Sequence, residues 1–191
     1  MTKAPRTALA AAVLTVLAGI SQAQAADIIP VIFDAAGTGY YDTTPATPVG
    51  GNPGTTKGEQ RRYVANYAAA LWGSVLQSDV PIYIGARFTP LGANVLGSAG
   101  AATVFANFPN APVANTWYHG ALADSLAGTD LNPGFTDINS NFSTDFTFYY
   151  GLDGNTPAGQ VNFLDVVMHE YAHGLGFSNF ETEQTGAFLS N

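Results

Sequence analysis

The sequence predicts an α+β fold, because segments with the period of a strand are interspersed with segments that have the period of a helix. Val80–Phe88 alternates as a strand does, whereas apolar residues in Glu59–Gln77 recur every three or four positions. No glycine-rich phosphate loop opens a helix, and no internal repeat is visible. We therefore expect a mixed β-sheet packed against a long helix at 59–77 and a second helix at 161–174.

The N-terminal third is expected to hold one strand and one long loop before the first helix. Asp27–Asp34 is predicted to be a strand, and Pro30 indicates a sheet edge or a strand end. Ala35–Gly58 is rich in Gly, Pro and Thr without periodicity, and loops of this length tend to be functional or mobile. The further expected elements are at least one strand in Val95–Phe108, a short helix at Asn115–Leu126, a turn-rich loop at Gly128–Asn141 and a strand at Thr144–Tyr150.

The first residues have the pattern of a signal peptide. Met1–Arg6 is short and basic, Thr7–Ile20 is apolar, and Ala23–Ala25 supplies the small residues that a signal peptidase reads. No later stretch approaches the roughly 20 apolar residues of a membrane span. We expect a signal peptide at 1–25, a domain at 26–191 and a secreted or periplasmic location; an uncleaved membrane anchor is the alternative.

Composition narrows the classes of partner and of metal ligand. The formal net charge of −8 argues against nucleic acid, which needs clustered Lys and Arg. The chain has no cysteine, so disulfides and thiolate ligands are excluded. A transition metal would have to be held by carboxylates and by the three histidines, His119, His169 and His173.

The segment Val161–Gly174 has the features of a capped amphipathic helix. Asn162 is a plausible N-cap, and Asp165 three residues later completes a pattern like that of a capping box. Gly174 and Gly176 offer a stop at its C-terminal end.

That helix carries His169, Glu170 and His173 in a pattern suited to zinc chemistry. Residues four apart leave the same helix face, so both imidazoles can converge on one ion. Glu170 lies one step round the helix, where it can reach a metal-bound water but not serve as a ligand. Zinc lowers the pKa of such a water to about 7, and a nearby carboxylate can take its proton. The alternative is a surface helix with two incidental histidines.

The motif and the residues after it resemble the zinc helix of a known group of peptidases. His169–Phe177 (HEYAHGLGF) is similar to the zinc-binding helix and glycine turn of metzincin-type and leishmanolysin-like metallopeptidases, with Gly176 at the turn position. The wider chain is similar to secreted bacterial metallopeptidase-like proteins that often carry a protease-associated domain. The segments that carry this second likeness are Val95–Gly100, Asn115–Ala123 and Tyr149–Asn155.

The resemblance implies a zincin-like N-terminal subdomain in a zinc-dependent endopeptidase that acts on protein or peptide. It makes His169 and His173 the zinc ligands and Glu170 the general base. Asn179 stands where the metzincin pattern has a third histidine, and no methionine follows Met168, so the methionine-containing turn of that family is not expected. A C-terminally truncated chain, with the third ligand beyond residue 191, is the simplest account at this stage.

Alternatives for the third ligand and for catalytic support lie within the chain. Glu181 or Glu183 could fold back to the metal, and His119 could approach from the preceding helix, although a packed histidine is the commoner case. Tyr149, Tyr150 and Tyr171 are candidates for stabilising an oxyanion, with core packing as the default. Thr144–Tyr150 is either an edge strand that pairs with a peptide substrate or an ordinary internal strand.

Two further hypotheses stay open. An oxygen-rich loop could hold calcium, although turn formation explains the same residues equally well; it comprises Asp130, Asn132, Asp137, Asn139 and Asn141. The rival to a peptidase is an exported binding or surface protein of zincin fold whose incomplete metal site is inactive. Neither the substrate sequence nor the oligomeric state is predicted.

Overall fold

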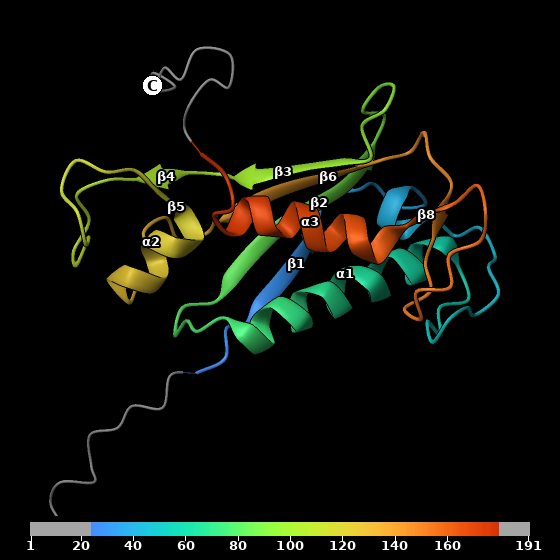
Figure 1. Ribbon diagram of the computed structural model, residues 1–191, viewed down its shortest axis with the longest axis horizontal. Coiled ribbons are helices and arrows are strands. Elements are labelled where there is room, and N and C mark those ends of the chain that lie inside the picture. The colour runs from blue at the N-terminus through green and yellow to red at the C-terminus, as the bar shows by residue number, and fades with distance from the viewer. Residues whose placement is uncertain (1–23, 180–191) are drawn as a thin grey trace, which may run out of the picture.

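A mixed β-sheet with two helices on one face forms the body of the protein (Figure 1). The computed structural model describes residues 24–179, so nearly all of the expected signal peptide lies outside the described residues. In chain order the elements are β1 (Ile28–Ile32), a 3₁₀ turn η1 (Gly39–Tyr41), α1 (Lys57–Val75), β2 (Ile82–Thr89), β3 (Gly97–Ala101), β4 (Val104–Phe105), β5 (Tyr118–His119), α2 (Gly120–Ala127), β6 (Ile138–Ser143), β7 (Phe148–Tyr149), β8 (Val161–Asn162) and α3 (Phe163–Leu175).

The main sheet has the strand order β1-β2-β6-β3. β1, β2 and β6 run parallel, and β3 pairs with β6 in the antiparallel direction. Pro30 therefore lies in an edge strand, as predicted, where its missing N–H costs no ladder bond. The predicted α+β class and the mixed sheet are confirmed.

The core lies between this sheet and the helices α1 and α3. Ile84, Ile138 and Phe142 are fully buried on the sheet face toward the helices, where Val64 of α1 and Tyr171 of α3 are also fully buried. The opposite face is more open, and Arg87 and Asn139 are exposed there. Each large apolar side chain buried in this layer contributes about 1.5–3 kcal/mol to the free energy of unfolding.

The first helix begins two residues before its predicted start because Thr56 is its N-cap. The Thr56 hydroxyl accepts from the N–H of Glu59 at 3.1 Å, and the Glu59 carboxylate accepts from the N–H of Thr56 at 3.1 Å. This reciprocal capping box satisfies two N–H groups that the helix leaves unpaired.

The motif helix α3 begins at Phe163, two residues after the start of the predicted segment, and its N-cap is Asn162 as predicted. The Asn162 side chain accepts from the N–H of Leu164 at 3.0 Å. The helix does not stop at Gly174, which lies inside the last turn. There a Cβ would approach the side chain of Ile138 at 2.3 Å, so this glycine lets the helix pack close to β6. The C-cap is Gly176, whose φ of +127° favours glycine.

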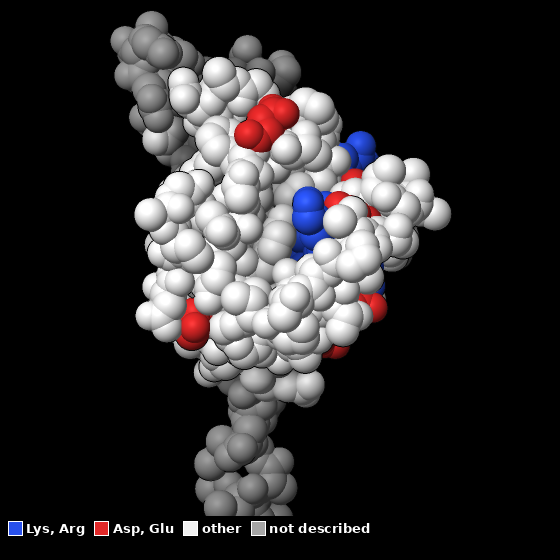
Figure 2. Space-filling view, turned by 90° about the vertical axis from the view of Figure 1, so that its right-hand side faces the viewer, with Lys and Arg blue, Asp and Glu red and all other residues white. Residues whose placement is uncertain are grey.

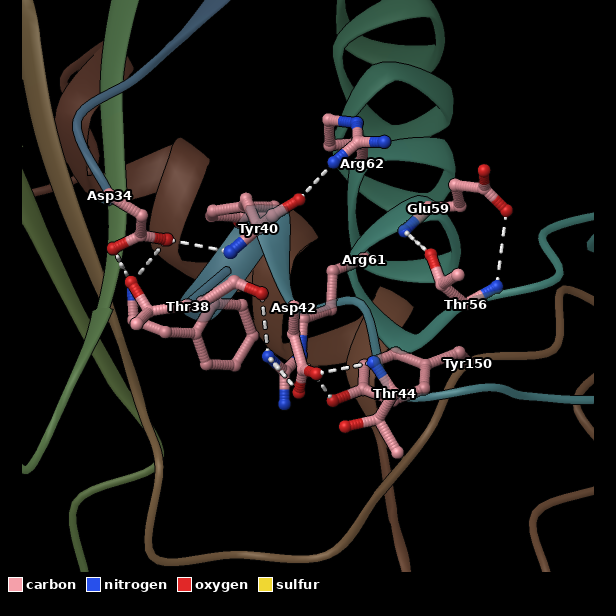
Figure 3. A network of polar contacts seen from close by, with 12 residues as sticks. Asp34, Thr38, Tyr40, Asp42, Thr44, Thr56, Glu59, Arg61, Arg62 and Tyr150 are labelled. Carbon is pink, nitrogen blue, oxygen red and sulfur yellow. Dashed lines mark hydrogen bonds and ion pairs between the residues drawn. The ribbon is translucent and has the colours of Figure 1, made fainter. Parts of the chain in front are cut away.

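The long loop before α1 is well anchored by polar contacts (Figure 3). Asp34 accepts from the N–H of Tyr40 at 2.7 Å and from that of Phe88 at 3.1 Å. Arg61 donates to Tyr150 at 2.8 Å, and its guanidinium lies 4.2 Å from the centre of the Phe88 ring. Tyr40 is fully buried, so this loop contributes to the hydrophobic core as well as connecting β1 to α1.

Three sequence-based expectations in the second half are corrected. The last four residues of the predicted loop Gly128–Asn141 belong instead to β6, a central strand of the sheet that begins at Ile138. Within Thr144–Tyr150 only the two residues of β7 are extended, and they pair with β8 outside the main sheet. The short helix starts at Gly120 rather than near Asn115, because Asn115 has a left-handed φ of +58° that a helix does not accommodate.

Charged side chains are sparse on the face drawn in Figure 2, and the positive ones form no continuous surface there. This agrees with a chain in which Asp and Glu outnumber Lys and Arg by 14 to 6. Within residues 24–179, none of the helices is long and apolar enough to cross a membrane.

Candidate metal centre

Helix α3 brings the two predicted ligand histidines together. Their Nε2 atoms lie 3.0 Å apart, with the ring planes nearly perpendicular. Two nitrogens bound to one tetrahedral zinc at 2.0–2.1 Å lie about 3.3 Å from each other. The observed separation of the His169 and His173 nitrogens is therefore close to what a shared zinc ion requires.

The ring of His173 is oriented by the turn that follows the helix. Its Nδ1 lies 2.7 Å from the carbonyl oxygen of Phe177, which the turn at Gly176 brings back toward the helix. A carbonyl accepts only, so this contact places the ring proton on Nδ1, and the lone pair of Nε2 faces Nε2 of His169. Metal-binding histidines commonly have such a second hydrogen bond, which fixes the tautomer and the ring plane.

Glu170 lies beside the histidines and is 8 % exposed. Burial raises the pKa of its carboxyl group, while His169, His173 and a hydrogen bond from the backbone of Ala99 act to lower it. A carboxylate with a raised pKa is a stronger base than a free glutamate, which suits it to accept a proton near neutral pH.

The edge strand β3 faces the motif helix across a narrow gap. A Cβ on Gly97 would lie 2.9 Å from Cγ of Glu170, so the absence of a side chain at Gly97 lets Glu170 approach the strand. Leu96 and Ala102 form ladder hydrogen bonds with the segment of β6. Because bonded pairs alternate in an antiparallel ladder, the backbone groups of Gly97, Ala99 and Ala101 point away from β6 toward the open edge.

Hollows flank Glu170 on both sides along this edge. One has a volume of about 530 Å³ and extends past His169 toward Asp165. The other, of about 560 Å³, extends past His173 toward His119 and Asn179. Gly97 and Glu170 line both hollows, so together they form one groove between β3 and α3 with the carboxylate at its middle.

His119 lines the groove but acts on the turn rather than on the histidine pair. It is 6 % exposed, its Nδ1 lies 3.1 Å from the carbonyl oxygen of Gly174, and its Nε2 lies 2.8 Å from the hydroxyl of Ser178. Both ring nitrogens are thus engaged on the segment that carries Phe177. His119 is therefore a packed, hydrogen-bonded histidine, which was the expected alternative to a metal ligand.

The third ligand is not found among the described residues. No group of three or more His, Cys, Asp or Glu side chains within 24–179 is arranged to hold a metal ion. Asn179 is exposed at the end of the groove, whereas Glu181 and Glu183 lie outside the described residues.

The three candidate tyrosines do not face the groove. Tyr171 is fully buried in the core, and burial raises the pKa of its hydroxyl well above the usual value. Tyr150 accepts from Arg61, and Tyr149 donates to Asp153 at 2.7 Å. All three tyrosines therefore have the packing role that was the expected alternative to stabilising an oxyanion.

The strand at the groove is β3 rather than the predicted candidate at Thr144–Tyr150. The sequence predicts at least one strand within Val95–Phe108 and indicates no functional role for it. A signal was present in Gly97–Ala101, five consecutive small residues, because such residues let another chain approach a strand closely.

The comparisons with known proteins add no relative, since no family model, curated protein or solved structure matches this chain.

Proposed function

We propose that this chain is an exported zinc-dependent endopeptidase with a zincin-like subdomain. The observation that carries the proposal is the convergence of the His169 and His173 Nε2 atoms at 3.0 Å, with Glu170 between them on the helix and at the centre of a groove. The export hypothesis rests separately on the signal-peptide pattern at 1–25.

Each group of the groove has a defined role in this proposal. His169 and His173 hold zinc, which when bound supplies a Lewis acid that polarises the scissile carbonyl and activates water. Glu170 accepts a proton from the attacking water and passes it to the leaving amine. Burial raises the pKa of this carboxyl, which makes it a stronger base toward the water than an exposed glutamate.

The substrate class follows from the edge strand. The outward backbone groups of Gly97 and Ala101 offer hydrogen bonds to an extended peptide, as does the carbonyl of Ala99, whose N–H already donates to Glu170. Such a peptide would pair with β3 as an added strand. Such pairing is made through the backbone and holds a scissile bond near Glu170. An unfolded or loosely structured protein segment is therefore the proposed substrate.

The test combines zinc content with cleavage of an unstructured protein such as casein. The mature chain should bind one zinc per molecule and cleave the substrate in a chelator-sensitive manner. Glu170→Gln should retain the zinc and lose about 10²–10⁴-fold in rate, the usual contribution of a general base. The His169→Ala and His173→Ala variants should lose the zinc itself.

Asp145→Asn is a matched control for Glu170→Gln, because it removes one carboxylate from an exposed position away from the groove. It should keep both zinc and activity. Full activity in Glu170→Gln would contradict the general-base role, and a wild-type chain without stoichiometric zinc would contradict the proposal itself.

A second function is favoured by the two-histidine site of the described residues. In that case the chain is an exported binding or surface protein of the same fold that holds metal weakly and cleaves nothing. It predicts weak zinc uptake and binding of extended peptides along β3 without their hydrolysis. Zinc binding at one per chain together with chelator-sensitive cleavage would exclude it.

A further inference from the structure

A histidine from outside the motif helix is bound to the turn that follows that helix. His119 is the last residue of β5, far from the motif in the sequence, and it is 6 % exposed. Its Nδ1 lies 3.1 Å from the carbonyl oxygen of Gly174, and its Nε2 lies 2.8 Å from the hydroxyl of Ser178. The imidazole therefore contacts both ends of the segment 174–178.

The partners of this ring determine where its proton lies. A carbonyl oxygen only accepts, so Nδ1 of His119 donates to Gly174, and in the neutral ring Nε2 accepts from the hydroxyl of Ser178. Gly174 lies in the last turn of α3, where carbonyl groups have no N–H partner within the helix. His119 thus caps the C-terminal end of α3 from a different part of the chain.

The segment between these two contacts carries the group that orients His173. The carbonyl oxygen of Phe177 lies 2.7 Å from Nδ1 of His173. This carbonyl belongs to the same planar peptide group as the N–H of Ser178, because a peptide bond joins the two residues. A displacement of Ser178 therefore moves the carbonyl that His173 contacts.

Other contacts hold this turn mainly on the N-terminal side of Phe177. The N–H of Phe177 donates to the carbonyl of Ala172 at 3.0 Å, and its ring centre lies 6.2 Å from that of Trp72. On the C-terminal side, the N–H of Ser178 donates to the carbonyl of Gly176 at 2.8 Å, which lies within the turn itself. Among residues 24–179, the hydrogen bond of Ser178 that reaches beyond the turn is the one to His119.

We propose that His119 is a positioning residue for the zinc ligand His173. It acts through the hydroxyl of Ser178 and thereby through the carbonyl of Phe177, which fixes the ring plane and the Nδ1–H tautomer of His173. Without that carbonyl, either ring of the histidine pair can donate its Nε2 proton to the other, because the two Nε2 atoms lie 3.0 Å apart. The consequence for zinc rests on the proposed function, whereas the tautomer of His173 is a property of the metal-free chain.

The first readout is the zinc affinity of the mature chain, measured by competition with a chromogenic chelator. Ser178→Ala removes the hydroxyl from an exposed position and should weaken the affinity about 10-fold, the lower end of the range for a lost outer-shell partner. His119→Phe keeps an aromatic ring without either hydrogen bond and should weaken the affinity at least as much. The double variant should be no weaker than His119→Phe, because both substitutions break the same contact.

The second readout requires neither zinc nor hydrolysis. Long-range ¹H–¹⁵N NMR of the metal-free chain at pH 8 reports which nitrogen of each imidazole carries the proton, and the signals of the three histidines are assigned from single variants. In the wild type the proton of His173 should lie on Nδ1, and in Ser178→Ala a substantial share should move to Nε2. A merely structural role for His119 would lower Tm without changing this distribution.

Tyr118→Phe is the matched control, because it removes a hydroxyl that accepts from the N–H of Val113 at 3.0 Å, in the residue next to His119. It should leave the zinc affinity and the His173 tautomer unchanged. An unchanged tautomer in Ser178→Ala would overturn the inference, and so would equal zinc affinities in Ser178→Ala and Tyr118→Phe. A wild-type chain that binds no zinc would contradict the proposed function alone, because the tautomer measurement on Ser178→Ala still decides the role of His119.

Discussion

Adding one methyl group at Gly97 is a test of how β3 positions the carboxylate of Glu170, the proposed general base. The new Cβ would lie 2.9 Å from Cγ of Glu170, whereas carbon atoms make favourable contact at about 3.5–4.0 Å. Glu170 must therefore move by roughly 0.6–1.1 Å, the difference between these distances. A misplacement of about 1 Å at a reacting group can cost about 10²-fold in rate.

We expect Gly97→Ala to lower kcat/KM on an unstructured protein by about 10- to 100-fold, the range for a displaced but intact base. Zinc content should not change, because neither histidine is touched. Stability should change little, since alanine in a strand gains about 0.5–1 kcal/mol over glycine and the strain at Glu170 offsets it. Steady-state kinetics, zinc analysis and Tm on one preparation provide the three readouts.

Gly100→Ala is the matched control, because it lies on the same strand and a Cβ there meets no atom within 4 Å. It should retain wild-type activity. Equal activity in the two variants would refute the reasoning, since Gly97 would then not determine where Glu170 lies. Loss of zinc in Gly97→Ala would refute it too, because the effect would extend beyond the carboxylate.

Two further predictions concern stability. Gly73→Ala should lower the free energy of unfolding, measured in urea, by about 1–3 kcal/mol. The new Cβ would lie 2.5 Å from the carbonyl oxygen of Ala26, and this clash outweighs a gain of about 1 kcal/mol in helix propensity. Stability should also decline as pH rises from about 4 to about 6, because burial of Asp137 raises its pKa to about 6 and the folded form therefore binds more protons there than an unfolded chain does. Asp137→Asn should remove that part of the slope in unfolding measured across pH.

Each stability prediction has its own control. Ser74→Ala changes the neighbouring exposed helix position and should leave the unfolding midpoint nearly unaltered, so a similar loss in both variants would mean that the contact with Ala26 is not the cause. Asp145→Asn should keep the wild-type pH slope. If Asp137→Asn also kept it, the buried carboxyl of Asp137 would not be the source of the decline.

The parts of the fold that follow from local sequence were predictable. The cap at Asn162, the helical spacing and the glycines after His173 define α3 from neighbouring residues alone, and the structure has that helix within two residues of its predicted start. Of the two glycines expected to stop the helix, Gly176 is the C-cap, whereas Gly174 serves close packing against Ile138, a residue that the sequence did not place in any strand.

The strands β3 and β6 depended on partners that local sequence does not reveal. β6 (INSNFS) carries asparagines on its open face, and its buried residues, Ile138, Ser140, Phe142 and Ser143, include only two apolar side chains. β3 (GSAGA) has almost no intrinsic preference for a strand, and it is extended because β6 supplies its hydrogen bonds. The sequence could therefore place the histidines on a helix but could not place the strand that faces them.

This division between local and long-range determinants also separates the proposed metal binding from the proposed hydrolysis. The histidine pair depends directly on α3 and on the carbonyl of Phe177, all within nine residues of the chain. The orientation of Glu170 depends in addition on Gly97 and Ala99, which reach it only through the packing of β3 on β6. Damage to that packing should thus reduce hydrolysis before it reduces zinc affinity, because the ligand geometry is set by contacts that do not include β3.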